Sequence, residues 1–315
     1  MRIEDRDAEA TAGIVSDAFG AEVRVEGLSA DTVRALFSPE ARPADPLPEG
    51  RPIRLALEGN GTGPGGPEPV VERLDDGTAL CRPGGPAEVR PADPRSFRDR
   101  LIPRCLHLGL AQQWARAGLA TAHAAAFEID GRGVLAFGPS TAGKSLLTLA
   151  ASARGARVVS DDWLLLGIGP DGPRAERLRE FLMVRAGGEA LLDALLAAQP
   201  GLAVRRAGDR KVVPLASAPS ERFPHAVDID ETWVMQVPEG PRRDRSEVRP
   251  VAAAAVLARL VESSMPLLFG ASFPAERAAL MQTARTWIQR SRCVEVETGT
   301  DLIEDPDRAW ARLLT

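Results

Sequence analysis

Cysteine is scarce in this chain of 315 residues, and an excess of positive charge is missing. The three cysteines, Cys81, Cys105 and Cys293, lie far apart and form no Cys-x-x-Cys pair. An odd number of widely spaced cysteines argues against a disulfide framework and against a structural zinc site. The net charge of -5 and the pI near 5.5 provide no electrostatic footprint for nucleic acid. We therefore expect reduced thiols in a cytoplasmic protein that has no nucleic-acid partner.

Long apolar runs are missing as well. No segment approaches the ~18 apolar residues of a membrane span. Residues 250–269 come nearest, but Arg259 and Glu262 interrupt them. Residues 1–7 are charged and lack the apolar stretch of a secretory signal. The sequence therefore predicts no membrane partner.

The length and the 44% hydrophobic content allow an ordinary core and suggest two domains, at roughly 100–200 residues each. Residues 1–95 are interpreted as a small N-terminal α+β domain, because the segment Pro91-Ala92-Asp93-Pro94 breaks the pattern that precedes it. Strands are expected in this domain at 21–25 and 53–57, a helix near 31–37, and a hairpin of 70–74 with 78–81 around Asp75-Asp76-Gly77.

Residues 96–315 alternate between helical and strand-like patterns, which is typical of an α/β fold. Helices are expected from 96 to about 119, from about 144, and at 188–198, 251–263, 274–291 and 305–314. Strands are expected at 122–129, 134–137, 156–159, 163–167, 211–214, 231–237 and 293–297.

Lysine is nearly absent, since only Lys144 and Lys211 contribute to the 39 Lys and Arg residues. Lys144 belongs to a segment that matches the phosphate-binding loop pattern G-x4-G-K-S in full, namely Gly138-Pro139-Ser140-Thr141-Ala142-Gly143-Lys144-Ser145. Glycines let backbone N–H groups turn toward phosphates, and the positive end of the following helix faces the same anions. Lys144 would contact the β- and γ-phosphates, and Ser145 would bind Mg²⁺. The pattern predicts a nucleoside triphosphate site; the alternative is a turn that only joins a strand to a helix.

Phosphoryl transfer also needs a group that orients or deprotonates the acceptor. Asp161 and Asp162 follow a short apolar strand, and Asp162 lies 17 residues after Ser145. We expect this pair at the carboxyl end of a strand beside the loop, the edge where open α/β sheets bind ligands. One carboxylate could hold the metal through water while the other accepts a hydroxyl proton. The alternative is a plain strand-to-loop cap. His123, taken alone, is more typical of a packed or solvated histidine than of a catalytic one.

The spacing of these segments resembles that of a known family. The segments are His123-Ala124-Ala125, Gly131-Arg132-Gly133-Val134-Leu135, the loop 138–145, Arg154-Gly155, and Val158-Val159-Ser160-Asp161-Asp162. Over residues 123–162 they resemble the HPr kinase/phosphorylase family. The resemblance implies a phosphoenolpyruvate-carboxykinase-like P-loop kinase domain at 96–315. It also implies that Lys144 binds phosphate, that Ser145 binds Mg²⁺, that Asp162 is the general base toward a serine hydroxyl, and that His123 is an active-site residue.

The sequence departs from the family pattern in its E-x-R-G segment, where Met183-Val184-Arg185-Ala186 replaces the metal-binding glutamate by Met183. A thioether is a soft ligand that suits Mg²⁺ poorly. Asp161 or Glu180 could compensate as metal ligands. Arg185 fits a phosphate or substrate clamp, since its planar fork suits phosphate oxygens, and the alternative is a surface arginine. Lys211 could also point into the site, and Thr141 stands where the family has glycine.

Three functions fit this sequence. The first is an ATP- and Mg²⁺-dependent kinase that phosphorylates a hydroxyl group, either a serine of a peptide or protein or a small hydroxyl compound. The second is a nucleotide-gated binding module without turnover, which Met183 favours. The third is a related transfer that uses pyrophosphate or phosphoenolpyruvate. The sequence leaves open the acceptor, the choice between ATP and GTP, any phosphorylase activity, and the oligomeric state, including a homo-oligomer.

Overall fold

The computed structural model describes residues 1–6, 11–26, 29–37, 53–57, 70–74, 77–81, 87–91, 110–111, 113–139, 141–184, 187–207, 210–215, 218–237, 243–264 and 274–315. Their contacts divide them into two compact units. The first comprises residues 1–120 with 265–283, and the second comprises 121–264 with 284–315. The domain boundary expected near residue 95 lies outside the described residues.

The first unit contains a seven-stranded antiparallel sheet of order β1-β2-β3-β4-β7-β6-β5. Its elements are β1 (Arg2–Asp5), β2 (Thr11–Ser16), β3 (Ala21–Glu26), α1 (Ala30–Phe37), β4 (Ile53–Leu57), β5 (Val70–Leu74), β6 (Gly77–Cys81) and β7 (Ala87–Pro91). The helix α1 packs on β1 and β2. Ile14, Val23, Val25 and Val33 are fully buried and belong to the core of this unit.

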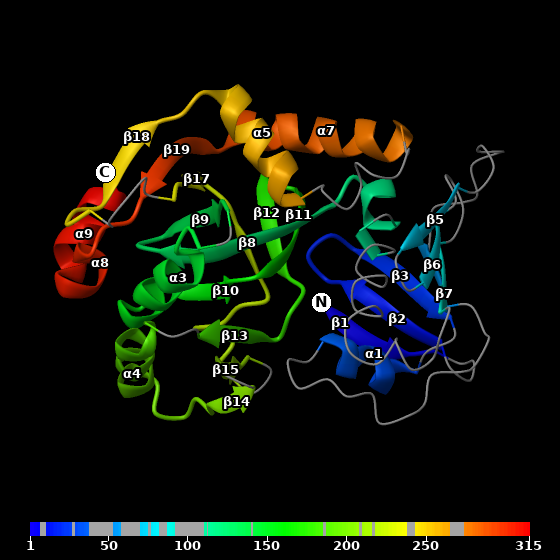
Figure 1. Cartoon of the computed structure of the whole chain (residues 1–315), viewed down its shortest axis with the longest axis horizontal. Helices are drawn as coiled ribbons and strands as arrows, with labels where there is room; N and C mark the ends of the chain where they lie inside the picture. The colour runs from blue at the N-terminus through cyan, green and yellow to red at the C-terminus, as the bar shows by residue number, and fades with distance from the viewer. Residues whose placement is uncertain are drawn as a thin grey trace. The chain divides into compact units, whose positions relative to one another are not determined.

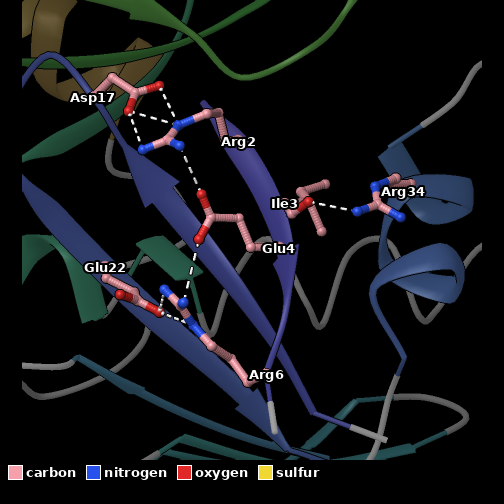
Figure 2. Close-up of polar contacts among 7 residues, drawn as sticks. All are labelled: Arg2, Ile3, Glu4, Arg6, Asp17, Glu22 and Arg34. Carbon is pink, nitrogen blue, oxygen red and sulfur yellow. Dashed lines mark hydrogen bonds and ion pairs between the residues drawn. The ribbon is translucent and has the colours of Figure 1, made fainter.

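Charged side chains cover the edge strand β1 (Figure 2). Arg2 pairs with Asp17 and with Glu4, at 2.8 and 2.7 Å. Glu4 also pairs with Arg6, at 3.2 Å, and Arg6 reaches Glu22 at 2.8 Å. Surface ion pairs of this kind contribute little stability, but charges along an edge strand discourage pairing with another chain. We interpret this row of charges as protection of the edge.

A nine-stranded mixed sheet forms the centre of the second unit (Figure 1). Its order is β16-β12-β11-β8-β9-β17-β19-β18, and β10 also pairs with β8. The strands β9, β17 and β19 are parallel, whereas β8 is antiparallel to β9 and β18 to β19. The bounds are β8 (Ala120–Ile129), β9 (Arg132–Phe137), β10 (Arg157–Ser160), β11 (Trp163–Ile168), β12 (Pro173–Arg177), β16 (Ala226–Asp228), β17 (Glu231–Met235), β18 (Glu247–Pro250) and β19 (Arg292–Glu297). A separate three-stranded sheet has the order β13-β15-β14, with β13 (Phe181–Val184), β14 (Arg205–Ala207) and β15 (Arg210–Pro214).

Helices cover both faces of the large sheet at β17. Thr232 accepts a hydrogen bond from the indole of Trp287 at 2.9 Å, and the next residue, Trp233, lies 6.2 Å from Trp310 between ring centroids. Because successive side chains of a strand point to opposite faces, Trp287 and Trp310 mark the two sides. The described helices that follow β8 in the chain are α3 (Lys144–Ala153), α4 (Glu189–Ala198), α5 (Ala253–Ser264), α7 (Pro274–Arg290), α8 (Asp301–Glu304) and α9 (Pro306–Leu313). Trp287 belongs to α7 and Trp310 to α9. Among the described residues, none of the helices is both long and apolar enough to cross a membrane.

The structure confirms the expected α/β class, with a mixed sheet and helices. The expected helices at 188–198, 251–263, 274–291 and 305–314 correspond to α4, α5, α7 and α9. Of the helix expected from residue 96, the structure describes residues 110–111 and 113–116, which are helical. The turn residues Asp75 and Asp76 lie outside the described residues. The strands that the sequence reading missed are β1, β2, β7, β12, β13, β14, β16 and β18.

Candidate functional site

Strand register brings three segments of the sequence to one edge of the large sheet. In the antiparallel pair of β8 and β9, Ala124 lies opposite Phe137, so His123 of β8 lies level with Gly138, the residue that follows β9. The strand β10 is antiparallel to β8 and therefore runs in the same direction as β9. Its carboxyl end, followed by Asp161, reaches the same edge. In the sheet, β8 lies between β10 and β9, so the aspartates follow a strand two positions away from the strand that leads into the loop.

The loop after β9 has backbone conformations that explain its glycines. A Cβ atom on Gly138 would lie 2.4 Å from the carbonyl oxygen of Met235, so a side chain does not fit there. Gly143 has a φ of 93°, and Thr141 has a φ of 76°. A left-handed φ at threonine costs about 1–2 kcal/mol, which glycine avoids. Ser140 lies outside the described residues.

Lys144 begins α3 and folds back over the loop. It is 5% exposed, and its Nζ donates hydrogen bonds to the carbonyl oxygens of Gly138 and Pro139 at 2.8 and 3.1 Å. Gly143, which precedes the helix, has no side chain that could cap the first N–H groups of α3. Free N–H groups at a helix start favour anions. The arrangement places a cation and a helix N-terminus at one loop.

Asp161 is a buried carboxyl group beside this loop. It is 4% exposed, accepts a hydrogen bond from the Ser145 side chain, and accepts one from the backbone N–H of Met183 at 3.4 Å. Burial, and next the charge of Asp162, raises the pKa of Asp161 to about 7 from 3.8. A divalent cation would offset both effects. Ser145 and Asp161 offer hard oxygen ligands that suit Mg²⁺, which keeps most of its other ligands as water and phosphate. The described residues contain no group of three or more His, Cys, Asp or Glu side chains that could hold a metal by themselves.

Asp162 makes contacts that differ from those of Asp161. One carboxylate oxygen, Oδ2, accepts a hydrogen bond from Arg179, and the other, Oδ1, lies 3.3 Å from Nε2 of His123. The carbonyl oxygen of Asp162 accepts the backbone N–H of Ala124 at 2.8 Å, which ties it to β8. The structure therefore brings His123 and Asp162 together. The sequence reading missed Arg179, because nothing in its neighbourhood distinguishes it from the other arginines.

Met183 lies next to Asp161 through its backbone, while its sulfur accepts a hydrogen bond from Arg210 at 2.8 Å. The structure does not bring Glu180 to Asp161 in any hydrogen bond among the described residues. Glu180 instead pairs with Arg177 at 2.9 Å and lies 3.7 Å from His225.

Two further residues were expected at the site. Lys211 is half-buried on β15, opposite Val184 of β13 and Arg206 of β14. No hydrogen bond among the described residues joins it to the loop. Arg185 lies outside the described residues.

The sequence matches no protein-family model and no curated protein. Among solved structures it matches the Hpr(Ser) kinase/phosphatase from Coxiella burnetii at 18% sequence identity and a TM-score of 0.27. The alignment covers 40% of this chain and 76% of that one. A TM-score this low does not establish a shared fold.

Proposed function

We propose that this protein is a kinase that transfers the γ-phosphoryl group of ATP to a hydroxyl group, with Mg²⁺ as cofactor. The observation that carries the proposal is the contact between Ser145 of the loop and the buried Asp161, with Asp162 as the next residue. A hydroxyl and a carboxylate for a metal, beside a second carboxylate for the acceptor, are the groups that phosphoryl transfer requires.

Each group in the loop has a role in this proposal. The N–H groups of the loop and of the first turn of α3 bind the phosphates. In the structure, Lys144 donates hydrogen bonds to the carbonyl oxygens of Gly138 and Pro139. When a nucleotide binds, it donates instead to the β- and γ-phosphate oxygens. Ser145 and Asp161 hold Mg²⁺, which neutralises charge on the phosphates when bound. The raised pKa of Asp161 fits this role, because a carboxyl group destabilised as an anion gains most from a cation.

Asp162 acts on the acceptor. It accepts the proton of the attacking hydroxyl while the new bond to phosphorus forms. His123, 3.3 Å from Oδ1, orients this carboxylate. The acceptor is a serine of a peptide or protein, or a small hydroxyl compound.

The test is incubation of the protein with γ-labelled ATP and a lysate of its native cell. The wild type should label an acceptor. Asp162→Asn should keep nucleotide affinity within about threefold and lower transfer by about 10²-fold or more, the usual contribution of a general base. Equal transfer by wild type and Asp162→Asn would show that Asp162 is not the base.

A second candidate function is a nucleotide-gated binding module. Met183 favours it, since the residue whose backbone N–H donates to Asp161 carries a thioether that contacts Arg210, in place of a carboxylate that could strengthen metal binding. ATP binding without any labelled product in the same lysate would support this alternative.

A further inference from the structure

Arg179 is a candidate for a second charged group in phosphoryl transfer. It lies in the segment between β12 and β13, and its side chain is 23% exposed. Its guanidinium lies 5.7 Å from the ring centre of Phe181, and its Nη1 donates to Oδ2 of Asp162. The aromatic face and the carboxylate fix the position of this cation.

The contact with Arg179 restricts what Asp162 can do. Both carboxylate oxygens are engaged, Oδ2 by Arg179 and Oδ1 by the nearby His123. A general base needs an oxygen directed at the acceptor hydroxyl. While Arg179 holds Asp162, the carboxylate is therefore masked.

Arg179 is also linked through Asp162 to the proposed phosphate site. Asp162 directly follows Asp161, and Asp161 contacts Ser145 of the phosphate-binding loop. Arg179 is thus hydrogen-bonded to Asp162, which directly follows the proposed metal ligand Asp161. Among the described residues its acceptor is Asp162, so other donors of its fork stay available. A planar guanidinium suits phosphate oxygens, and an arginine supplied in cis or in trans stabilises the transferring group in other phosphoryl-transfer enzymes.

We propose that Arg179 is a catalytic residue that masks Asp162 until a triphosphate binds. This inference rests on the proposed kinase function. The γ-phosphoryl oxygens draw the guanidinium away from Asp162, which frees the carboxylate for the acceptor. The bond from the γ-phosphorus to the β–γ bridging oxygen then breaks, and a bond from phosphorus to the acceptor oxygen forms. The acceptor proton passes to Asp162, ADP leaves with the bridging oxygen, and Arg179 neutralises the charge on the transferring group.

Equilibrium titrations with MgATP and with MgADP test this assignment on the full chain. Because Arg179 contacts only the γ-phosphoryl group, Arg179→Ala should lower the preference for MgATP over MgADP by about tenfold. Affinity for MgADP should stay within about threefold of wild type. Transfer from γ-labelled ATP should fall by about 10³-fold. Arg179→Lys, which keeps the charge and loses the fork, should recover part of the preference and serves as the test if Arg179→Ala does not fold.

Arg174 offers a matched control. It lies on the neighbouring strand β12, its side chain is 29% exposed, and it pairs with Asp228 at 2.6 Å. Arg174→Ala should keep the wild-type preference. In one outcome, the wild type prefers MgATP while Arg179→Ala either keeps that preference or loses affinity for both nucleotides equally. In that case Arg179 has only a structural role, and the inference fails while the proposed kinase function stands. If the wild type binds neither nucleotide, the proposed function fails and this inference fails with it.

Discussion

Replacement of Asp161 by asparagine should stabilise the nucleotide-free protein at alkaline pH. Asp161 is 4% exposed, and burial beside Asp162 raises its pKa to about 7, compared with 3.8 for an unperturbed aspartate. The folded protein therefore holds this proton more tightly than the unfolded chain does. The free energy of unfolding therefore carries no penalty from Asp161 below about pH 4. It falls as pH rises from about 4 toward 7, and above about pH 7 the loss stays constant. A difference of about 3 pKa units corresponds to about 4 kcal/mol at most.

Asparagine cannot ionise, so it removes this loss while its side-chain oxygen can still accept the N–H of Met183. Between pH 5 and pH 8 the stability of Asp161→Asn relative to wild type should increase by about 3 kcal/mol. Urea unfolding followed by tryptophan fluorescence measures this change, because four of the five tryptophans lie in the second unit. Mg²⁺ should reduce the difference by stabilising the wild-type carboxylate.

Asp162→Asn is the comparison variant, because it removes the neighbouring charge, which is only the second cause of the raised pKa of Asp161, and its pH-dependent stabilisation should therefore be smaller than that of Asp161→Asn. An unchanged difference between wild type and Asp161→Asn across this pH range would refute the reasoning. It would mean that Asp161 does not lie buried as a charged group at the loop.

The remaining predictions concern the loop and its partners. Gly138→Ala should destabilise the protein by about 1–3 kcal/mol in urea unfolding, because its Cβ would lie 2.4 Å from a backbone oxygen. Gly201→Ala, where nothing lies within 4 Å of the added atom, should change stability by less than about 0.5 kcal/mol. In calorimetric titrations, Asp162→Asn and Arg179→Ala should both retain MgADP binding within about threefold of wild type, because neither side chain is proposed to contact ADP.

Local patterns predicted the central part of the site. The apolar run 134–137 and the apolar positions after Lys144 predict a strand and a helix, which the structure confirms as β9 and α3. Phosphate binding by the glycine loop between them stays a prediction. The two aspartates after an apolar strand were also recognisable. The contact between Asp161 and Ser145, which joins the two motifs, is visible only in the structure.

Other features depend on tertiary contacts that the sequence does not encode locally. The position of β8 between β9 and β10 is one example, because hydrophobic periodicity indicates where a strand lies in the sequence but not which strand it pairs with. The strands β12, β13, β14 and β16 have three to five residues, which is too short for an alternating pattern to distinguish them from loops. Arg179 is one arginine among many until its contact with Asp162 is seen.

The most direct test of the account is a calorimetric titration of MgATP into the wild type and into Lys144→Met. The wild type should bind MgATP, and loss of the Lys144 cation should weaken binding by at least about tenfold, the contribution of a charge-assisted hydrogen bond to phosphate. Arg174→Ala should bind like the wild type. A wild type that does not bind MgATP, or a Lys144→Met variant that binds it equally well, would contradict the assignment of this loop as a nucleotide site.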